Sequence, residues 1–217
     1  MTAHLPALIC VVSTAVLMGS ELRDATAVRG VSKVIAASSF IAYAITMGAS
    51  RIGAPGTWVL AALALCMVGD LCLLSRAKST FLAGIGAFLL GHVAYIGAFA
   101  SLGVHAMGTA VAAALVAVIA ALVWQWLSPH TGNLTPAVAA YVIVISAMVA
   151  MATGSAILDP TPGRLGLLAA ATGFFCSDLC VARDRFVVPG PQNRMIGLPL
   201  YFGSQLAFAA AIGFAVG

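Results

Sequence analysis

Long apolar runs separated by short polar stretches make up almost the whole chain. An α-helix needs about 20 mainly apolar residues to cross the hydrocarbon core of a bilayer. Backbone polar groups inside lipid must be satisfied within their own segment, so apolar runs of this length are predicted to be helices. Eight predicted helices cover residues 4–20, 31–49, 56–74, 81–101, 107–127, 136–157, 164–182 and 197–215.

The polar stretches between these runs are short and rich in turn-forming residues, as in "RIGAPG", "SPHTGNLTP" and "DPTPG". They leave no room for a separate soluble domain. The first run lacks the basic region of a secretory signal, so we expect it to remain as a helix. The predicted fold is therefore an all-α polytopic membrane protein, with residues 1–217 forming a single integral membrane domain.

The composition agrees with this fold class. Hydrophobic residues make up 62% of the chain and charged residues only 7%, whereas about 25% of the residues in a soluble domain are charged. The net charge of +4 comes from basic residues scattered between apolar runs, so we expect no nucleic-acid partner. The cysteines lie within apolar segments, where we interpret them as packing residues.

The basic residues predict an orientation in the membrane. Eight crossings place both termini on one side, and only Arg51 and Arg164 are expected there. By the positive-inside rule the other side is cytoplasmic and both termini lie outside. We expect a bacterial inner or plasma membrane. The cytoplasmic loops and helix ends are predicted to carry the other basic residues: Arg23, Arg29, Lys33, Arg76, Lys78, Arg183, Arg185 and Arg194.

Two apolar runs each contain an acid, Asp70 in "CMVGDLCLL" and Asp178 in "FFCSDLCVA". Each acid lies four residues before the predicted cytoplasmic end of its helix. With a rise of 1.5 Å per residue, both lie roughly 3–8 Å below the boundary, as do Lys33, Tyr141 and Tyr201. Residues far apart in the chain are thus predicted to share one layer.

Other polar residues continue from this layer into the membrane. His92 and Tyr95 are predicted about 16 and 21 Å deep, and their spacing of three puts them on one helix face. Tyr201 and Gln205 form an i, i+4 pair. We expect a cavity open to the cytoplasm, with an acidic mouth and a narrower aromatic interior. Three nearby phenylalanines are expected to pack only: Phe81, Phe88 and Phe186.

A weak internal repeat accompanies the two acids. The "DLC" at residues 70–72 recurs 108 residues later, and "KVIAAS" at 33–38 recurs as "YVIVIS" with the same offset. Four helices separate the copies, so a 4+4 repeat would be parallel, about an axis along the membrane normal.

Acids at membrane depth are rare and are functional hypotheses by default. The structural alternative is an ion pair, for example between Lys33 and either aspartate. Two carboxylates within a few ångströms cannot both ionise cheaply, so one keeps a proton and the pair supplies an acid beside a base. The chain has no GxSxG, HExxH or glycine-rich phosphate motif, which argues against serine, zinc and nucleotide chemistry.

The chain resembles the YhhN family of membrane lysoplasmalogenases. The similarity runs through the Lys33 helix, "GD" at 69–70, "FLAGIGAFLLGHVAY" at 81–95, Tyr141, "SDLCVARDRF" at 177–186 and "LYFGSQ" at 200–205. It implies hydrolysis, without a cofactor, of the sn-1 vinyl ether of a lysophospholipid in the bilayer. The products would be a fatty aldehyde and glycerophosphocholine or glycerophosphoethanolamine.

The resemblance implies roles for individual residues. Asp70 and Asp178 would be catalytic, one as the proton donor and the other as a base, with the order left open. Lys33 and Tyr141 would bind phosphate or tune the acids. Four further candidates would orient water and the ether oxygen: His92, Tyr95, Tyr201 and Gln205. Ser177 is a further supporting or substrate-binding candidate.

Two other functions fit the same residues. A proton-coupled transporter of a small molecule or lipid would use the same pair of acids. A structural or lipid-binding membrane protein would pair both acids with Lys33 in a dry interior. The sequence leaves the oligomeric state open.

Overall fold

The computed structural model describes residues 2–23, 25–75 and 77–215. Across these residues, eight helices are long and apolar enough to cross a membrane, which confirms the predicted fold class. They are α1 (Leu5–Leu22), α2 (Thr26–Thr46), α3 (Ala54–Cys72), α4 (Lys78–Leu102), α5 (Ala106–Leu127), α6 (Thr135–Leu158), α7 (Pro162–Ala182) and α8 (Pro191–Ala211).

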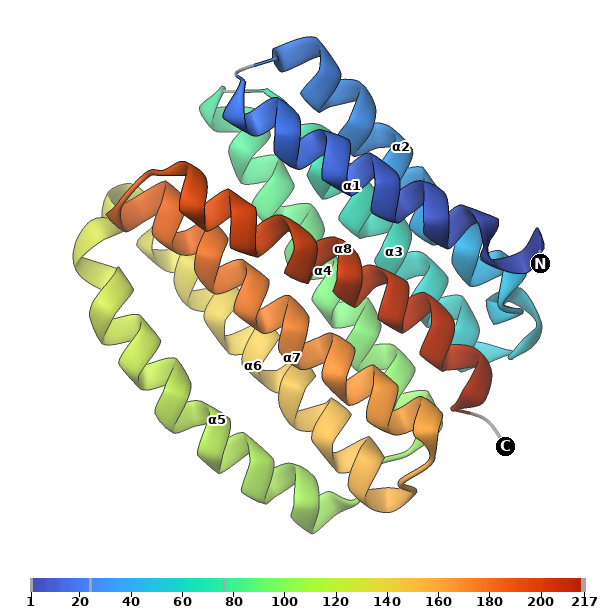
Figure 1. Ribbon diagram of the computed structural model, residues 1–217. Coiled ribbons are helices and arrows are strands. Elements are labelled where there is room, and N and C mark those ends of the chain that lie inside the picture. The colour runs from blue at the N-terminus through green and yellow to red at the C-terminus, as the bar shows by residue number, and fades with distance from the viewer. Residues whose placement is uncertain (1, 24, 76, 216–217) are drawn as a thin grey trace.

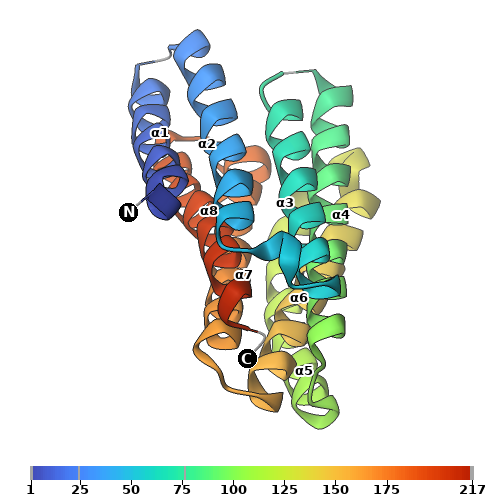
Figure 2. The same ribbon diagram turned by 90° about the vertical axis from the view of Figure 1, so that its right-hand side faces the viewer.

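Consecutive helices pack as pairs, α1 with α2, α3 with α4, α5 with α6, and α7 with α8 (Figure 1). Both termini lie toward one end of the bundle, while α1, α3, α5 and α7 finish toward the other (Figures 1 and 2). We call the second end the basic end because most basic residues of the described chain lie there: Arg23, Arg29, Lys33, Lys78, Arg183, Arg185 and Arg194.

Contacts between the pairs close the bundle. Helix α2 packs against α3 and α8, α6 packs against α4 and α7, and α1 packs against α8. Helix α5 lies at the outer edge, mainly against α6 (Figure 1). Only 6% of the residues in the 18-residue apolar stretch of this helix are buried, whereas 50% are buried in the corresponding stretch of α4. One side of α5 therefore faces the surroundings rather than the protein.

The helix pairing follows the predicted 4+4 repeat in part. The contacts of α2 with α3 and α8 correspond to those of α6 with α7 and α4. The extensive contact of α1 with α8, however, has no counterpart of similar size between α5 and α4. The duplication itself remains a prediction.

Helices α2 and α8 begin five and six residues earlier than the hydropathy predicted. Helix α2 starts at Thr26 rather than at residue 31, and α8 starts at Pro191 rather than at 197. Arg29 and Arg194 therefore lie on helices, not in loops; Arg76 lies outside the described residues. Long basic side chains can reach the membrane surface from a first helical turn.

Glu21, near the end of α1, forms ion pairs with both of these arginines. Its Oε2 lies 3.6 Å from Arg29 Nη1 and accepts a hydrogen bond from Arg194 Nη1 at 2.6 Å. This carboxylate joins α1, α2 and α8 at the basic end. It lets charged residues occupy helical positions that apolar patterning alone would exclude.

The seventh helix does not stop at Ala182, where the prediction ended it. The chain continues as a π-helix, Arg183–Val187, and the Val188 N–H donates to the Arg183 carbonyl at 2.9 Å. Short π-helices are rare and often occur at functional sites. Asp178 therefore lies deeper from the basic end than a helix ending at 182 would place it.

An aromatic cluster fills the middle of the bundle. The Tyr201 ring of α8 contacts Phe88 of α4 and Phe174 of α7, with ring centroids 5.8 and 5.5 Å apart. Phe40 of α2 contacts the same ring at 6.4 Å. Rings from three other helices thus hold the Tyr201 ring, whose hydroxyl donates to Asp70 of α3.

Candidate active site

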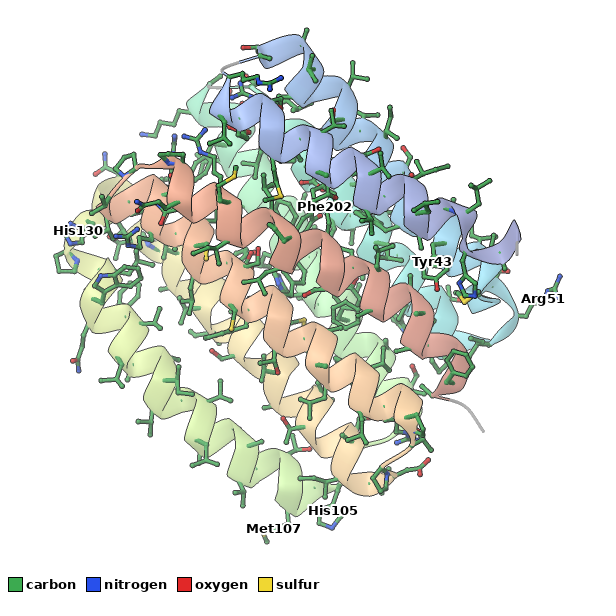
Figure 3. The ribbon with its side chains drawn as sticks, viewed as in Figure 1. Tyr43, Arg51, His105, Met107, His130 and Phe202 are labelled. Carbon is green, nitrogen blue, oxygen red and sulfur yellow. The ribbon has the colours of Figure 1, made fainter. Side chains whose placement is uncertain are left out.

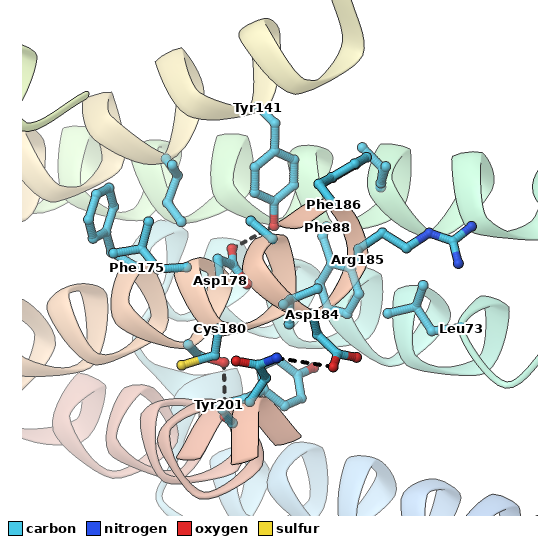
Figure 4. Close-up of a pocket in the computed structure, with 18 of the residues that line it drawn as sticks. Leu73, Phe88, Tyr141, Phe175, Asp178, Cys180, Asp184, Arg185, Phe186 and Tyr201 are labelled. Carbon is cyan, nitrogen blue, oxygen red and sulfur yellow. Dashed lines mark hydrogen bonds between the residues drawn. The ribbon is translucent and has the colours of Figure 1, made fainter. Parts of the chain in front are cut away.

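A cavity of about 190 Å³ lies at the basic end of the bundle (Figure 4). All five residues predicted to share one layer line it, and they come from five helices, α2, α3, α6, α7 and α8. The depth argument thus grouped residues that the fold brings together: Lys33, Asp70, Tyr141, Asp178 and Tyr201.

Asp70 lies in the last turn of α3, where its residue is only 2% exposed. The Tyr201 hydroxyl donates to Asp70 Oδ2 at 2.6 Å, and Lys33 Nζ lies 3.0 Å from Oδ1. Both carboxylate oxygens therefore have a partner, and one of these partners is a cation. Asp70 is thus ion-paired with Lys33, which is the structural role that the sequence offered as an alternative to catalysis.

Asp178 has different neighbours. The Tyr141 hydroxyl donates to Asp178 Oδ2 at 2.6 Å (Figure 4), and His92 Nε2 lies 3.5 Å from the same oxygen. In the described part of the chain, neither lysine nor arginine forms an ion pair with this carboxyl group. Only one of the two acids is thus paired with Lys33.

The two acids occupy corresponding positions in the two halves. Each lies on the third helix of its half, α3 or α7. Each is contacted from the second helix of its own half, by Lys33 or Tyr141, and from the fourth helix of the other half. Tyr201 supplies that last contact to Asp70, and His92 supplies it to Asp178. The two acids are thus contacted from corresponding helices but by different side chains.

His92 reaches Asp178 although the sequence placed it well below the acids. His92 Nε2 lies 3.5 Å from Asp178 Oδ2, so the predicted separation in depth is wrong for this pair. The imidazole is fully buried against the Phe174 ring, at a centroid distance of 4.5 Å, and does not line the cavity. His92 therefore supports Asp178 from behind.

Tyr95 and Gln205 lie deeper still and do not line the cavity. The Tyr95 hydroxyl donates to Gln205 Oε1 at 2.6 Å, and both side chains are fully buried. Ser177 does line the cavity, but its hydroxyl donates to the Gly197 carbonyl at 2.9 Å and so joins α7 to α8. These three residues are arranged as supports rather than as reacting groups.

Sequence reasoning missed the rim of the cavity. Phe81 and Phe186, expected only to pack, line the cavity with their ring centroids 6.3 Å apart. Arg185 also lines it, and its guanidinium lies 4.0 Å over the Phe81 ring. The "RDRF" after the second acid was a visible signal, but it was interpreted as a marker of membrane orientation.

The cavity is apolar where it approaches α5. Val123 and Leu127 of α5 line it together with Phe175 and Leu179 of α7. Val123 and Leu179 also line a second, neighbouring depression. We call the surface formed by these four residues the α5–α7 groove. The cavity therefore has a charged rim at one end and an apolar groove at the other.

The described residues contain no group of three or more His, Cys, Asp or Glu side chains placed to hold a metal ion. The cysteines in these residues are unpaired. The polar side chains that line the cavity carry carboxyl, phenol, ammonium and guanidinium groups, together with the Cys180 thiol, the Ser177 hydroxyl and the Asn193 amide.

Fold and cavity together define a multi-pass membrane protein with two acids directed to one cavity at the basic end. The chain belongs to the YhhN family, because the sequence model of that family matches residues 28–212. The family predicted from the motifs is confirmed.

Curated relatives carry the name of an enzyme. A protein of Mycobacterium bovis named "Lysoplasmalogenase" is 33% identical over 201 residues, covering 89% of this chain and 70% of the relative. "Lysoplasmalogenase TMEM86A" of Bos taurus is 30% identical over 157 residues, covering 70% of this chain and 64% of the relative. These names favour a hydrolase over a transporter. No solved structure matches the chain.

Proposed function

We propose that this chain is a lysoplasmalogenase, which hydrolyses the vinyl ether of a lysoplasmalogen to a fatty aldehyde and a glycerophosphodiester such as glycerophosphocholine or glycerophosphoethanolamine. The observation that carries the proposal is that two acids with different partners, Asp70 and Asp178, line one cavity. The names of the relatives support the same reaction.

The shape of the cavity suits a single-chain lipid. The hydrocarbon chain would lie in the α5–α7 groove, and the polar end would face the basic rim. The ether bond joins these two parts of the lipid. It would therefore lie between groove and rim, in the part of the cavity that Asp70 and Asp178 line.

The partners of the two acids suggest separate roles. Lys33 gives Asp70 a counterion at 3.0 Å, so Asp70 is assigned as the carboxylate that stabilises positive charge and accepts a proton. Asp178 has no such counterion among the described residues, and Tyr141 occupies its Oδ2. Its other oxygen would carry the proton, so Asp178 is assigned as the proton donor.

The reaction begins when Asp178 gives its proton to the β-carbon of the vinyl ether. The double-bond electrons form the new C–H bond and leave an oxocarbenium ion. Water adds to the α-carbon and gives a proton to Asp70, which produces a hemiacetal. The Asp178 carboxylate then takes the hemiacetal hydroxyl proton while Asp70 protonates the departing glycerol oxygen. Aldehyde and alcohol leave, and both acids are restored.

Aldehyde release from a purified alkenyl lysophospholipid tests the proposal. Asp70→Asn and Asp178→Asn should each lower kcat by about 100-fold or more, the size usual for general acid–base catalysis. Asp159→Asn is the matched control, because Asp159 lies at the opposite end of the bundle with its side chain 48% exposed. Near-normal turnover by either test variant, with intact folding, would contradict the two-acid mechanism.

A further inference from the structure

The cations at the basic rim of the cavity differ in whether they already have a carboxylate partner in the protein. Lys33 is paired with Asp70. Arg194 contacts Glu21 and, at 3.5 Å, Asp184. These charges already have carboxylate partners, so an incoming anion would have to compete with a protein carboxylate for each of them.

Arg185 differs from these cations. It is exposed and lines the cavity, and the contact described for its guanidinium is with the face of the Phe81 ring at 4.0 Å. It forms neither an ion pair nor a side-chain hydrogen bond within the described residues. A ring beneath the guanidinium holds its position but does not use the N–H groups at its edge.

The π-helix places this arginine. Arg185 lies in the middle of Arg183–Val187, and the next residue, Phe186, packs against Phe81 of α4. The two aromatic rings thus connect the π-helix to α4 at the cavity rim. In Figure 4 the Arg185 side chain extends away from Asp178.

We infer that Arg185 binds the phosphate group of the lysolipid headgroup, an inference that rests on the proposed function. A guanidinium can bind two phosphate oxygens at once through paired N–H donors, which the ammonium of Lys33 cannot do. The phosphate of a lysoplasmalogen lies at the far end of the glycerol from the vinyl ether. A cation directed away from the proposed proton donor, at the exposed rim, matches that separation.

A phosphate-binding Arg185 would make the site selective among substrates. Arg185 would contribute to binding of substrates that carry a phosphodiester, whatever amine follows it. It would contribute nothing to an alkenylglycerol that lacks phosphate. The expected effect is on KM rather than on kcat, because the reacting bond is remote from the guanidinium.

Steady-state hydrolysis of a lysoplasmalogen and of the matching phosphate-free 1-alkenylglycerol provides the test. Arg185→Gln should raise KM for the lysoplasmalogen about tenfold or more, as expected for loss of hydrogen bonds to a charged group. Its KM for the alkenylglycerol should not change. Arg185→Lys should recover part of the loss, because it keeps the charge but not the two-pronged geometry.

Arg51→Gln is the matched control. Arg51 is exposed and lies at the end of the bundle where the termini are (Figure 3), remote from the basic rim. Neither substrate should distinguish this variant from the wild type. If Arg185→Gln weakens both substrates equally, the arginine has a structural role, and if it weakens neither, phosphate binds elsewhere. Either result overturns the inference.

Equilibrium binding separates this inference from the proposed function. A non-cleavable 1-alkyl lysophosphocholine should bind the wild type at least tenfold more tightly than Arg185→Gln, even if no aldehyde is ever released. If the lipid binds in this way but no aldehyde is released, the proposed function fails while the phosphate site stands. Equal binding to both proteins would overturn the site. Binding of inorganic phosphate alone, with the same dependence on Arg185 and the same affinity as the lipid, would overturn the lipid headgroup as the ligand.

Discussion

At the scale of single residues, Asp70 and Asp178 acquire different characters from their neighbours. Each is the first residue of an Asp-Leu-Cys tripeptide, and each lies on the third helix of its half. The difference comes from the second helix of each half, which supplies an ammonium group in one case and a phenol in the other. A second difference lies on α8 and α4, because Tyr201 donates to Asp70 whereas His92 lies beside Asp178.

Tyr141→Phe should lower turnover about tenfold while leaving the fold intact. The substitution removes the hydroxyl that donates to Asp178 at 2.6 Å but keeps the ring that contacts His92, and a hydrogen bond to such a group contributes about 1.5 kcal/mol. Aldehyde release and thermal unfolding measure the two effects. Tyr43→Phe is the matched control, because the Tyr43 hydroxyl contacts His4, outside the cavity. Equal losses in both variants would contradict a specific role for Tyr141.

Lys33→Met should destabilise the protein by about 3–5 kcal/mol, because it leaves a buried carboxylate without its counterion. The ammonium lies 3.0 Å from Asp70, which is 2% exposed. The double variant Lys33→Met/Asp70→Asn should recover much of that loss, since it removes both charges. Thermal unfolding in the same detergent measures all three proteins. A double variant no more stable than Lys33→Met would show that the pair does not matter to the fold.

The grouping of candidate residues could be predicted because depth in a membrane follows from position along a helix. That argument brought Lys33, Asp70 and Tyr201 to one layer without any knowledge of contacts. It could not place Arg185, whose position depends on a π-helix that has no hydropathy signal. It could not say which acid Lys33 would pair with either, because rotation of each helix about its axis is set by packing.

At the scale of elements, hydropathy located all eight helices but not all of their ends. The predicted ends fail where charged residues belong to a first helical turn, as Arg29 does in α2 and Arg194 does in α8. Glu21 contacts both arginines, and this pairing is visible only once three helices are assembled. Local polarity is therefore a poor guide to a helix end when a partner lies on another helix.

Gly69→Ala should lower stability by about 1–3 kcal/mol through overpacking. A Cβ at Gly69 would lie 2.6 Å from Phe88 Cε2, and the Phe88 ring is itself held against Tyr201. Because Asp70 follows in the chain and bonds to Tyr201, turnover should fall as well. Gly86→Ala is the control: it has open space around its Cβ position, so thermal unfolding should be unchanged or slightly improved. Unchanged stability of Gly69→Ala would mean that α3 and α4 separate easily.

At the scale of the whole molecule, the distribution of charge predicts how the bundle lies in the membrane. Described basic residues are concentrated at the end where the cavity lies, whereas Arg51 and Arg164 lie at the end with the termini. The positive-inside rule predicts that the cavity lies at the cytoplasmic face. Substrate would come from the inner leaflet.

Reporter fusions test this orientation. An enzyme that is active only outside the cytoplasm should be active when fused to either terminus. A fluorescent protein that folds only in the cytoplasm should be fluorescent when inserted in the connection between α5 and α6, at Thr131. The opposite pattern would place the cavity at the outer face and reverse the leaflet from which substrate comes.

The position of α5 at the outer edge of the bundle has a consequence for kinetics. Because α5 lies at this edge and also lines the cavity through Val123 and Leu127, we expect a lipid to reach the reacting groups past this helix from the leaflet, without dissolving first in water. The rate would then depend on the mole fraction of substrate in the membrane surface rather than on its bulk concentration. In mixed micelles or vesicles, adding inert lipid at constant bulk substrate should slow turnover in proportion to the dilution of the surface, while adding buffer should leave it unchanged.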